Sequence, residues 1–274
     1  MTERRSKPRD GEERWRTALT QIEPNKILVR GYPLDEMMGR LTFAESIYLL
    51  LVGELPTPAI GRMVEAMLVS FIDHGPTPPS TLAARNVATT GATLRGCVAS
   101  GVLGFGRFFG GDIQATMEML DNGLALMRDG SSVQNAATTT LNYYRQRGEL
   151  PPGFGHRYHS RDPRAARLFQ MALELELDGE HVALIRAMEM ELHRRPSREE
   201  KQTPVNIDGA IAAVCGDLGI PAEIADGLFM ISRIPGIVAH ALEEKERHAP
   251  LRRIDPEDFV YDGPGQRRLP ERRR

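Results

Sequence analysis

Helix-forming segments with recognisable start and stop residues follow one another along almost the whole chain. Thr42-Phe-Ala-Glu45 is a capping-box pattern, and the apolar run after it ends at Gly53. Thr57-Pro58 places a capping residue before a proline at the first helical position. These signals predict an all-α fold with one short extended segment at 26–30. Besides the helices at 42–53 and 57–73, we expect helices at 80–90, 94–105, 112–127, 132–144, 162–177, 180–193, 206–218, 222–232 and 238–247.

The composition narrows the class of protein. The chain has 274 residues, 41% of them hydrophobic, which is enough for one large or two smaller domains. The net charge of −2 gives no reason to expect nucleic acid or a membrane surface as a partner. Apolar runs such as 47–52 are too short to span a bilayer. The basic ends, 1–16 and 266–274, are expected to be disordered tails.

Two further features bear on location and packing. Cys97 and Cys215 lie in apolar helical patterns, which predicts free core thiols and fits a reducing cytoplasm. The N-terminus is charged and has no apolar leader, so a cytoplasmic protein is expected. The segment Gly91–Gly106 is rich in glycine, alanine and serine. Small residues let helix backbones approach closely, so a deeply buried central helix is expected there.

A glycine-rich turn that delivers one histidine is the clearest candidate for a binding site. It reads Pro151-Pro-Gly-Phe-Gly-His-Arg157, and Arg161-Asp-Pro-Arg164 follows closely. Glycines let backbone groups approach a ligand, and arginines offer forked donors to carboxylate or phosphate. The pattern indicates a site for a large anionic substrate with one titratable group at its centre. The alternative is a surface turn with solvated arginines.

Other candidate residues have structural alternatives as well. His74 lies at a helix end before a turn, and Asp208 opens an apolar helix. Asp208 is either a general acid or base in a pocket of low dielectric constant, or a helix-start charge that complements the dipole. His156 and His159 are three residues apart, but the sequence has no HExxH motif or paired-cysteine spacing, so no metal is expected.

Several ordered segments together resemble the citrate synthase superfamily. The first pair, Val29–Pro33 and Leu49–Thr57, is similar to the family's RGYP and LLxGxLPT signatures. The others, in family order, are Asp73-His-Gly with Ser80–Arg85 and Thr89–Ala92, Gly153–Arg157 with Asp162-Pro-Arg164, Asn206-Ile-Asp208, and Leu228–His240. The resemblance covers roughly residues 25–265.

One departure from the family pattern bears on the reaction. Citrate synthases carry a histidine before a pair of glycines, whereas this chain has Phe109 before Gly110-Gly111. That segment, the Asp73-His-Gly-Pro76 stretch and the C-terminal Leu251–Arg253 resemble the citryl-CoA lyase module of ATP-citrate lyase. The resemblance therefore favours reversible Claisen-type cleavage of citryl-CoA, or of a close 3-hydroxy-3-carboxyacyl-CoA, to acetyl-CoA and oxaloacetate.

The resemblance also implies an architecture and an assembly. The fold would be citrate synthase-like, with a large helical domain from 17–111 and 219–265. A smaller helical domain, 112–218, would be inserted into it. The chain would form a homodimer or a dimer of dimers. We expect Gly91–Gly106 in the interface, because close backbone packing is the best use of its many small residues. The substrates would be a CoA thioester and a 2-oxoacid, without a metal ion.

The resemblance assigns roles residue by residue. Its implied catalytic residues are His74, His156 and Asp208, with Asp208 handling the carbon-bound proton. The implied binding residues are Arg164, Arg233 and Arg253 for substrate carboxylates, and Pro152, Gly153, Phe154, Gly155, Arg157 and Arg161 for CoA. Two alternatives stay open: a citrate or 2-methylcitrate synthase that tolerates Phe109, and a non-catalytic homologue that binds CoA or a carboxylate and has a regulatory role.

Overall fold

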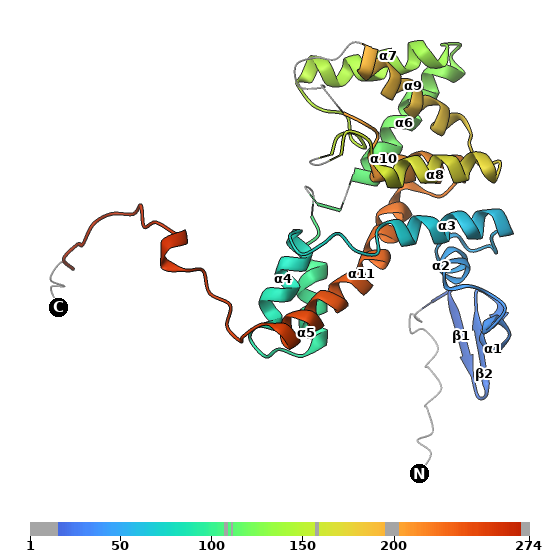
Figure 1. The fold of residues 1–274 in the computed structure, drawn as a ribbon. Coiled ribbons are helices and arrows are strands. Elements are labelled where there is room, and N and C mark those ends of the chain that lie inside the picture. Colours follow the sequence, from blue (N-terminus) through green and yellow to red (C-terminus); the bar gives the residue numbers. More distant parts are fainter. Residues whose placement is uncertain (1–15, 107–108, 111, 157–158, 195–202, 270–274) are drawn as a thin grey trace, which may run out of the picture. The chain divides into compact units, whose positions relative to one another are not determined.

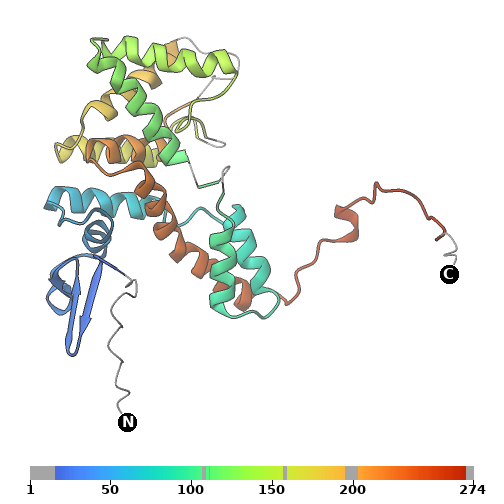
Figure 2. The same ribbon diagram turned by 180° about the vertical axis from the view of Figure 1, so that it is seen from behind.

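The computed structural model describes residues 16–106, 109–110, 112–156, 159–194 and 203–269, and the chain divides into two compact units. The first unit contains 1–73 and 106–233, and the second contains 74–105 and 234–274. Most of the two predicted tails lies outside the described residues. Figures 1 and 2 show the elements from opposite sides, and the expected predominance of helix is confirmed.

The helices and strands account for most of the described chain. In the first unit they are β1 (Thr20–Glu23), β2 (Lys26–Val29), β3 (Tyr32–Pro33), α1 (Leu34–Met37), α2 (Phe43–Val52), α3 (Pro58–Ser70), α6 (Asp112–Arg128), α7 (Val133–Arg147), α8 (Pro163–Glu174), α9 (Glu180–Arg194) and α10 (Ile207–Asp217). The second unit contains α4 (Pro79–Ala88), α5 (Leu94–Leu103) and the 3-10 turn η1 (Pro256–Asp258), and α11 (Ala222–Arg247) has residues in both.

The N-terminal strands and the start of α2 show how local sequence sets local structure. The expected extended segment is β2, the middle strand of an antiparallel sheet in the order β1-β2-β3. β1 was missed because its residues are all exposed and carry no apolar pattern; it forms by backbone pairing with β2. Thr42 and Glu45 form the expected capping box at α2, worth about 1 kcal/mol.

Helix α10 lies at the centre of the first unit. It packs against α6, α8 and α9, and Figure 1 shows these helices crowded around it. Every residue from Gly209 to Cys215 is buried, as expected for a helix that is apolar on all sides. Cys97 and Cys215 are both buried and free, as predicted. The domain boundaries at 112 and 218 stay a prediction.

In the second unit, α5 is not the deeply buried central helix that its small residues suggested. Leu94 and Leu103 are exposed, and only Cys97 and Gly101 are buried within the chain. The small residues serve close contacts on one side instead: a Cβ at Gly101 would lie 2.7 Å from Ile237 Cγ2, and a Cβ at Gly104 would lie 2.9 Å from Ser80 Cα. A single stripe of small residues is enough for that approach, which leaves the rest of α5 on the surface.

Buried ion pairs link the two chain segments of the second unit, 74–105 and 234–274. The Glu244 carboxylate accepts from Arg85 Nε at 2.7 Å and from Arg252 Nε at 3.1 Å. The Glu244 side chain is fully buried, so both arginines compensate a charge that would otherwise be costly. The neighbouring Arg253, which the family resemblance implied for carboxylate binding, is exposed.

The two helices predicted at 222–232 and 238–247 are one helix, α11, with Pro235 inside it. A proline removes one backbone donor and usually ends or kinks a helix. Here the helix continues because buried side chains hold both of its halves, Leu228 and Phe229 before the proline and Ile237 and Ala241 after it. Among the described residues, α11 is the one helix whose length and composition would also allow it to cross a membrane, a test that core helices of globular proteins pass too.

Candidate functional site

The glycine-rich turn is fixed to the start of α10. Phe154 forms an antiparallel bridge with Val205, and Asn206 N donates to the Gly153 carbonyl at 3.0 Å. Gly153 has φ +80°, and a Cβ there would lie 2.8 Å from Gly209 Cα. Only glycine fits this backbone position. The turn is therefore a rigid structure and not a solvated loop.

Asp162 links the first turn of α8 to the first turn of α10. Its Oδ1 accepts from Arg164 Nε at 3.1 Å, its Oδ2 accepts from Arg164 Nη2 at 2.9 Å, and Oδ2 also accepts from Ile207 N at 3.1 Å. Burial by itself raises the pKa of Asp162, but the hydrogen bonds and charge of Arg164 outweigh it and hold that pKa below its usual value. Asp162 is thus an ionised anchor that orients the Arg164 guanidinium.

Asp208 has the opposite electrostatic behaviour, although it lies in the same part of the unit. It is the second residue of α10, and its backbone is fixed by the Asn206 cap, whose side chain accepts from Gly209 N at 3.0 Å. Desolvation, reinforced by the charge of Asp112, raises the pKa of Asp208 to about 7 against the attraction of Arg164 and Arg233. A carboxyl with such a pKa can both give and take a proton near neutral pH.

Arg233 on α11 is a buried cation without a hydrogen-bonding acceptor among the described residues. It is 1% exposed, and none of its three side-chain nitrogens has a hydrogen-bond partner there. Its guanidinium carbon lies 5.1 Å from the centre of the Phe229 ring. Burial lowers the pKa of Arg233 to about 10, against the attraction of Asp73 and Asp208, so it stays charged at neutral pH. A buried guanidinium of this kind is suited to a carboxylate ligand.

His156 leaves the glycine-rich turn with a defined proton arrangement. Its Nδ1 accepts from His159 N at 3.2 Å, so the neutral ring carries its proton on Nε2. Desolvation, together with the charge of His159, lowers the pKa of His156 and favours that neutral form. Nε2–H is then a donor for a substrate oxygen. The two rings are 4.3 Å apart, and the described residues hold no group of three side chains suited to a metal ion.

Phe109, the residue that departs from the family pattern, lies in an aromatic cluster beside Arg233. Gly106 and Phe109 exchange two backbone hydrogen bonds, of 2.9 and 2.8 Å. The Phe109 ring packs edge-on against the Phe229 ring, with 6.1 Å between the ring centres. The backbone at Gly110 also approaches Phe229 closely, because a Cβ there would lie 2.7 Å from Phe229 Cε1. The residue therefore presents apolar surface where citrate synthases carry a donor.

The structure brings together part of the predicted site. Asp208, Arg164 and Arg233 interact electrostatically, and His156 interacts with Arg164 and Asp162. Pro152, Gly153, Phe154 and Gly155 form the fixed turn, and Arg161 is exposed just before α8. His74 and Arg253 are exposed residues of the second unit. Arg157 lies outside the described residues.

Two acidic residues of the site were missed as functional candidates. Asp162 was recognised only as the start of a helix, although its position two residues before Arg164 was a usable signal. Asp112 follows the paired glycines and raises the pKa of Asp208 by charge repulsion. No sequence pattern places these two acids near Asp208, because the contact of α6 with α10 is tertiary.

Comparison with known proteins agrees with this geometry. The family model described as citrate synthase, C-terminal domain, matches residues 56–254. The solved structure of citryl-CoA lyase from Hydrogenobacter thermophilus is 41% identical, covers 93% of this chain and 97% of its own, and has a TM-score of 0.84. ATP citrate lyase from Methanosaeta concilii, solved with (3S)-citryl-CoA, shares the fold at 21% identity and TM-score 0.76, over 95% of this chain and 43% of its own.

A curated citrate synthase from Heyndrickxia coagulans is 30% identical over 212 residues, which is 76% of this chain and 54% of the relative. The chain thus spans about half the length of that relative but nearly the whole of the solved lyase. The family match extends over well more than half of the sequence and includes the turn, Arg164, Asp208 and Arg233. The chain therefore belongs to the citrate synthase family.

Proposed function

We propose that this protein is an enzyme that cleaves citryl-CoA, or a close 3-hydroxy-3-carboxyacyl-CoA, to acetyl-CoA and oxaloacetate. One observation carries the proposal: a carboxyl with a pKa of about 7, Asp208, interacts with two arginines that can neutralise substrate carboxylates. Arg233 in particular is buried without a hydrogen-bonding acceptor among the described residues. The full-length similarity to a solved citryl-CoA lyase supports the same reaction.

The cleavage step balances with protonated Asp208 as the proton donor and solvent water as the proton acceptor. The tertiary hydroxyl loses its proton to water, and the carbon–carbon bond breaks as the oxygen becomes a ketone. The bonding electron pair passes to the CH₂ of the thioester and forms the enolate of acetyl-CoA. Protonated Asp208 delivers a proton to that carbon. The Nε2–H of His156 donates to the oxygen that becomes the ketone of oxaloacetate, which stabilises the negative charge developing there.

Phe109 removes a donor from the place where citrate synthases carry a histidine. The enolate of acetyl-CoA forms in both directions of the reaction, and a donor at the thioester oxygen would stabilise it in both, so this departure alone does not select the direction. Loss of one such donor typically costs about 2.7–4 kcal/mol of barrier. Phenylalanine offers none, and in this chain its ring faces Phe229. A citrate or 2-methylcitrate synthase that tolerates Phe109 is the second candidate.

The test is to incubate the purified protein with citryl-CoA, and separately with acetyl-CoA plus oxaloacetate, while following oxaloacetate and free thiol. Rapid release of oxaloacetate in the first arm, with little free thiol in the second, supports a lyase. Rapid oxaloacetate-dependent release of CoA in the second arm identifies a synthase. No turnover in either arm, together with tight CoA binding, identifies the non-catalytic binding homologue.

The assembly and the location belong to the same proposal. We expect a homodimer or a dimer of dimers in the cytoplasm, with His74 and Arg253 contributing to the substrate site. The surface of α5 and the exposed Phe259, Val260 and Tyr261 provide apolar area for a partner copy. Light scattering at micromolar concentration should show at least twice the monomer mass; a monomer would contradict this part of the proposal.

A further inference from the structure

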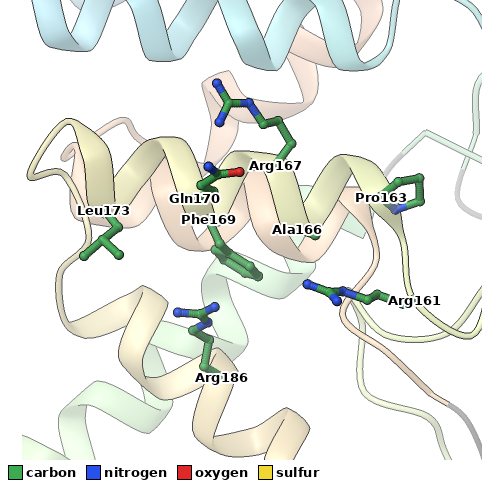
Figure 3. A pocket seen from close by; sticks show the side chains of 8 residues that line it. All are labelled: Arg161, Pro163, Ala166, Arg167, Phe169, Gln170, Leu173 and Arg186. Atoms are coloured by element: carbon green, nitrogen blue, oxygen red, sulfur yellow. The ribbon is translucent and has the colours of Figure 1, made fainter.

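A pocket lined by arginines lies within the first unit. It has a volume of about 670 Å³ and lies against α8 and α9 (Figure 3). Its lining residues are Arg161, Pro163, Ala166, Arg167, Phe169, Gln170, Leu173 and Arg186. The lining carries three positive charges and no acidic side chain, which fits an anion with more than one negative charge.

Two of the arginines are available to a ligand. In Figure 3 the Arg161 side chain extends toward Phe169 from the right and the Arg186 side chain from below, whereas Arg167 extends away from them. Arg167 pairs with Glu174 at 3.3 Å. Neither Arg161 nor Arg186 has a carboxylate partner among the described residues. The pair of arginines therefore faces the pocket with an uncompensated charge of +2.

The pocket is held in shape before any ligand arrives. The guanidinium carbon of Arg186 lies 5.2 Å from the centre of the Phe169 ring, a cation–π contact that orients it. Phe169 is itself 6% exposed, so its ring belongs to the core. Arg161 and Pro163 flank Asp162, whose carboxylate is fixed by its bonds to Arg164 and Ile207. A donor that is already oriented, as Arg186 is, loses less entropy on binding.

We infer that this pocket binds the phosphoryl groups of an organic phosphate, with Arg161 and Arg186 as paired donors. Forked guanidinium groups match phosphate oxygens, and two of them suit a dianionic group better than a single carboxylate. The volume accommodates the organic part, and Ala166 and Leu173 offer it apolar surface. Arg161 is also one of the residues that the family resemblance implied for CoA, so the inference rests on the proposed function if the ligand is CoA, and is independent of it if the ligand is a separate metabolite.

The phosphoryl groups have two possible sources, and the experiment separates them. One is the phosphorylated end of a CoA thioester, and the other is a free phosphorylated metabolite. The probe is adenosine 3′,5′-bisphosphate, titrated by calorimetry into the full-length protein, with adenosine as the uncharged control ligand. The variants are Arg161→Gln, Arg186→Gln and the double substitution. Arg128→Gln, an exposed arginine at the end of α6, is the matched control.

We expect adenosine to bind at least tenfold more weakly than the bisphosphate. Each single substitution should weaken bisphosphate binding about tenfold or more, whereas Arg128→Gln leaves it unchanged. Displacement of the probe by CoA assigns the pocket to the substrate's own phosphates, and binding unaffected by saturating CoA assigns it to a separate metabolite. No bisphosphate binding at millimolar concentration, or equal binding to the wild type and the double variant, overturns the inference. Asp208→Asn, which tests the reaction, should leave this binding intact.

Discussion

Asp208→Asn should make the protein more stable at neutral pH while removing its activity. The carboxyl has an ordinary pKa of 3.8, and burial together with Asp112 raises it to about 7 in the folded chain. Between these two values the folded state binds a proton that the unfolded state has released. Stability therefore falls as the pH rises through this window, and the full difference corresponds to about 4 kcal/mol.

Asparagine resembles the permanently neutral form of the residue, so the variant avoids that loss. From the two pKa values, the free energy of unfolding of the variant should exceed that of the wild type by about 2 kcal/mol at pH 5.5 and about 4 kcal/mol at pH 8. Urea unfolding followed by circular dichroism at both pH values measures it. The control is Asp129→Asn, the same substitution at an exposed residue just after α6, outside the site.

The same variant should lose about 10²- to 10⁴-fold in cleavage of citryl-CoA, the usual contribution of a general acid or base. An equal stability difference at pH 5.5 and pH 8 would refute the pKa argument. A variant less stable than the wild type at pH 8 would refute it as well. Near-normal turnover would refute the assignment of Asp208 to proton transfer, whatever the unfolding data show.

Three other substitutions test the remaining parts of the site. Asp162→Asn should lower the free energy of unfolding by about 3 kcal/mol at pH 7, because it leaves Arg164 without its partner. The pKa of Asp162 is lowered on folding, so this difference should shrink below about pH 4, and urea unfolding at pH 7 and pH 3 measures it. Gly153→Ala should lower the free energy of unfolding by about 2–3 kcal/mol, because the new Cβ would collide with Gly209. The control Gly219→Ala, at φ +67° with open space around it, should lower it by only about 1 kcal/mol in the same assay. Phe109→His should raise the oxaloacetate-dependent release of CoA at least about tenfold by restoring a donor to the thioester oxygen, and Phe109→Leu should not; equal rates in the two variants would show that a donor at this position does not contribute to the reaction.

Local sequence signals predicted where several of the helices begin. Thr42 and Glu45, Thr57 before Pro58, and Asp162 before Pro163 each begin a helix where the sequence predicts one, because a cap acts within one turn of the chain. Tertiary contacts decided the rest. Pro235 reads as a helix break until the packing on both sides of it is known. The small residues of α5 predict close approach, but not which face makes the contact.

The residue types of the site could be predicted, but their electrostatics could not. Sequence patterns selected Arg164, Asp208 and Arg233, yet gave no reason to expect opposite pKa shifts for Asp162 and Asp208. The difference depends on which carboxylate the Arg164 guanidinium reaches and on how much water each carboxyl keeps. Both are properties of the packed α8 and α10.

The two carboxyls have opposite pKa shifts because their partners differ in kind. Asp162 receives two direct hydrogen bonds from Arg164 and one from a backbone N–H, so its charge is stabilised and it stays ionised. Asp208 interacts with Arg164 and Arg233 through space, which only partly offsets its desolvation and the repulsion of Asp112. Because Arg164 is already bonded to Asp162 and Arg233 is not bonded to any described acceptor, a substrate carboxylate can approach Arg233 without first displacing a protein carboxylate. One carboxyl thus holds the binding group in place, and the other is left able to exchange a proton near neutral pH, which is the division of roles that the proposed carbon–carbon cleavage of citryl-CoA requires.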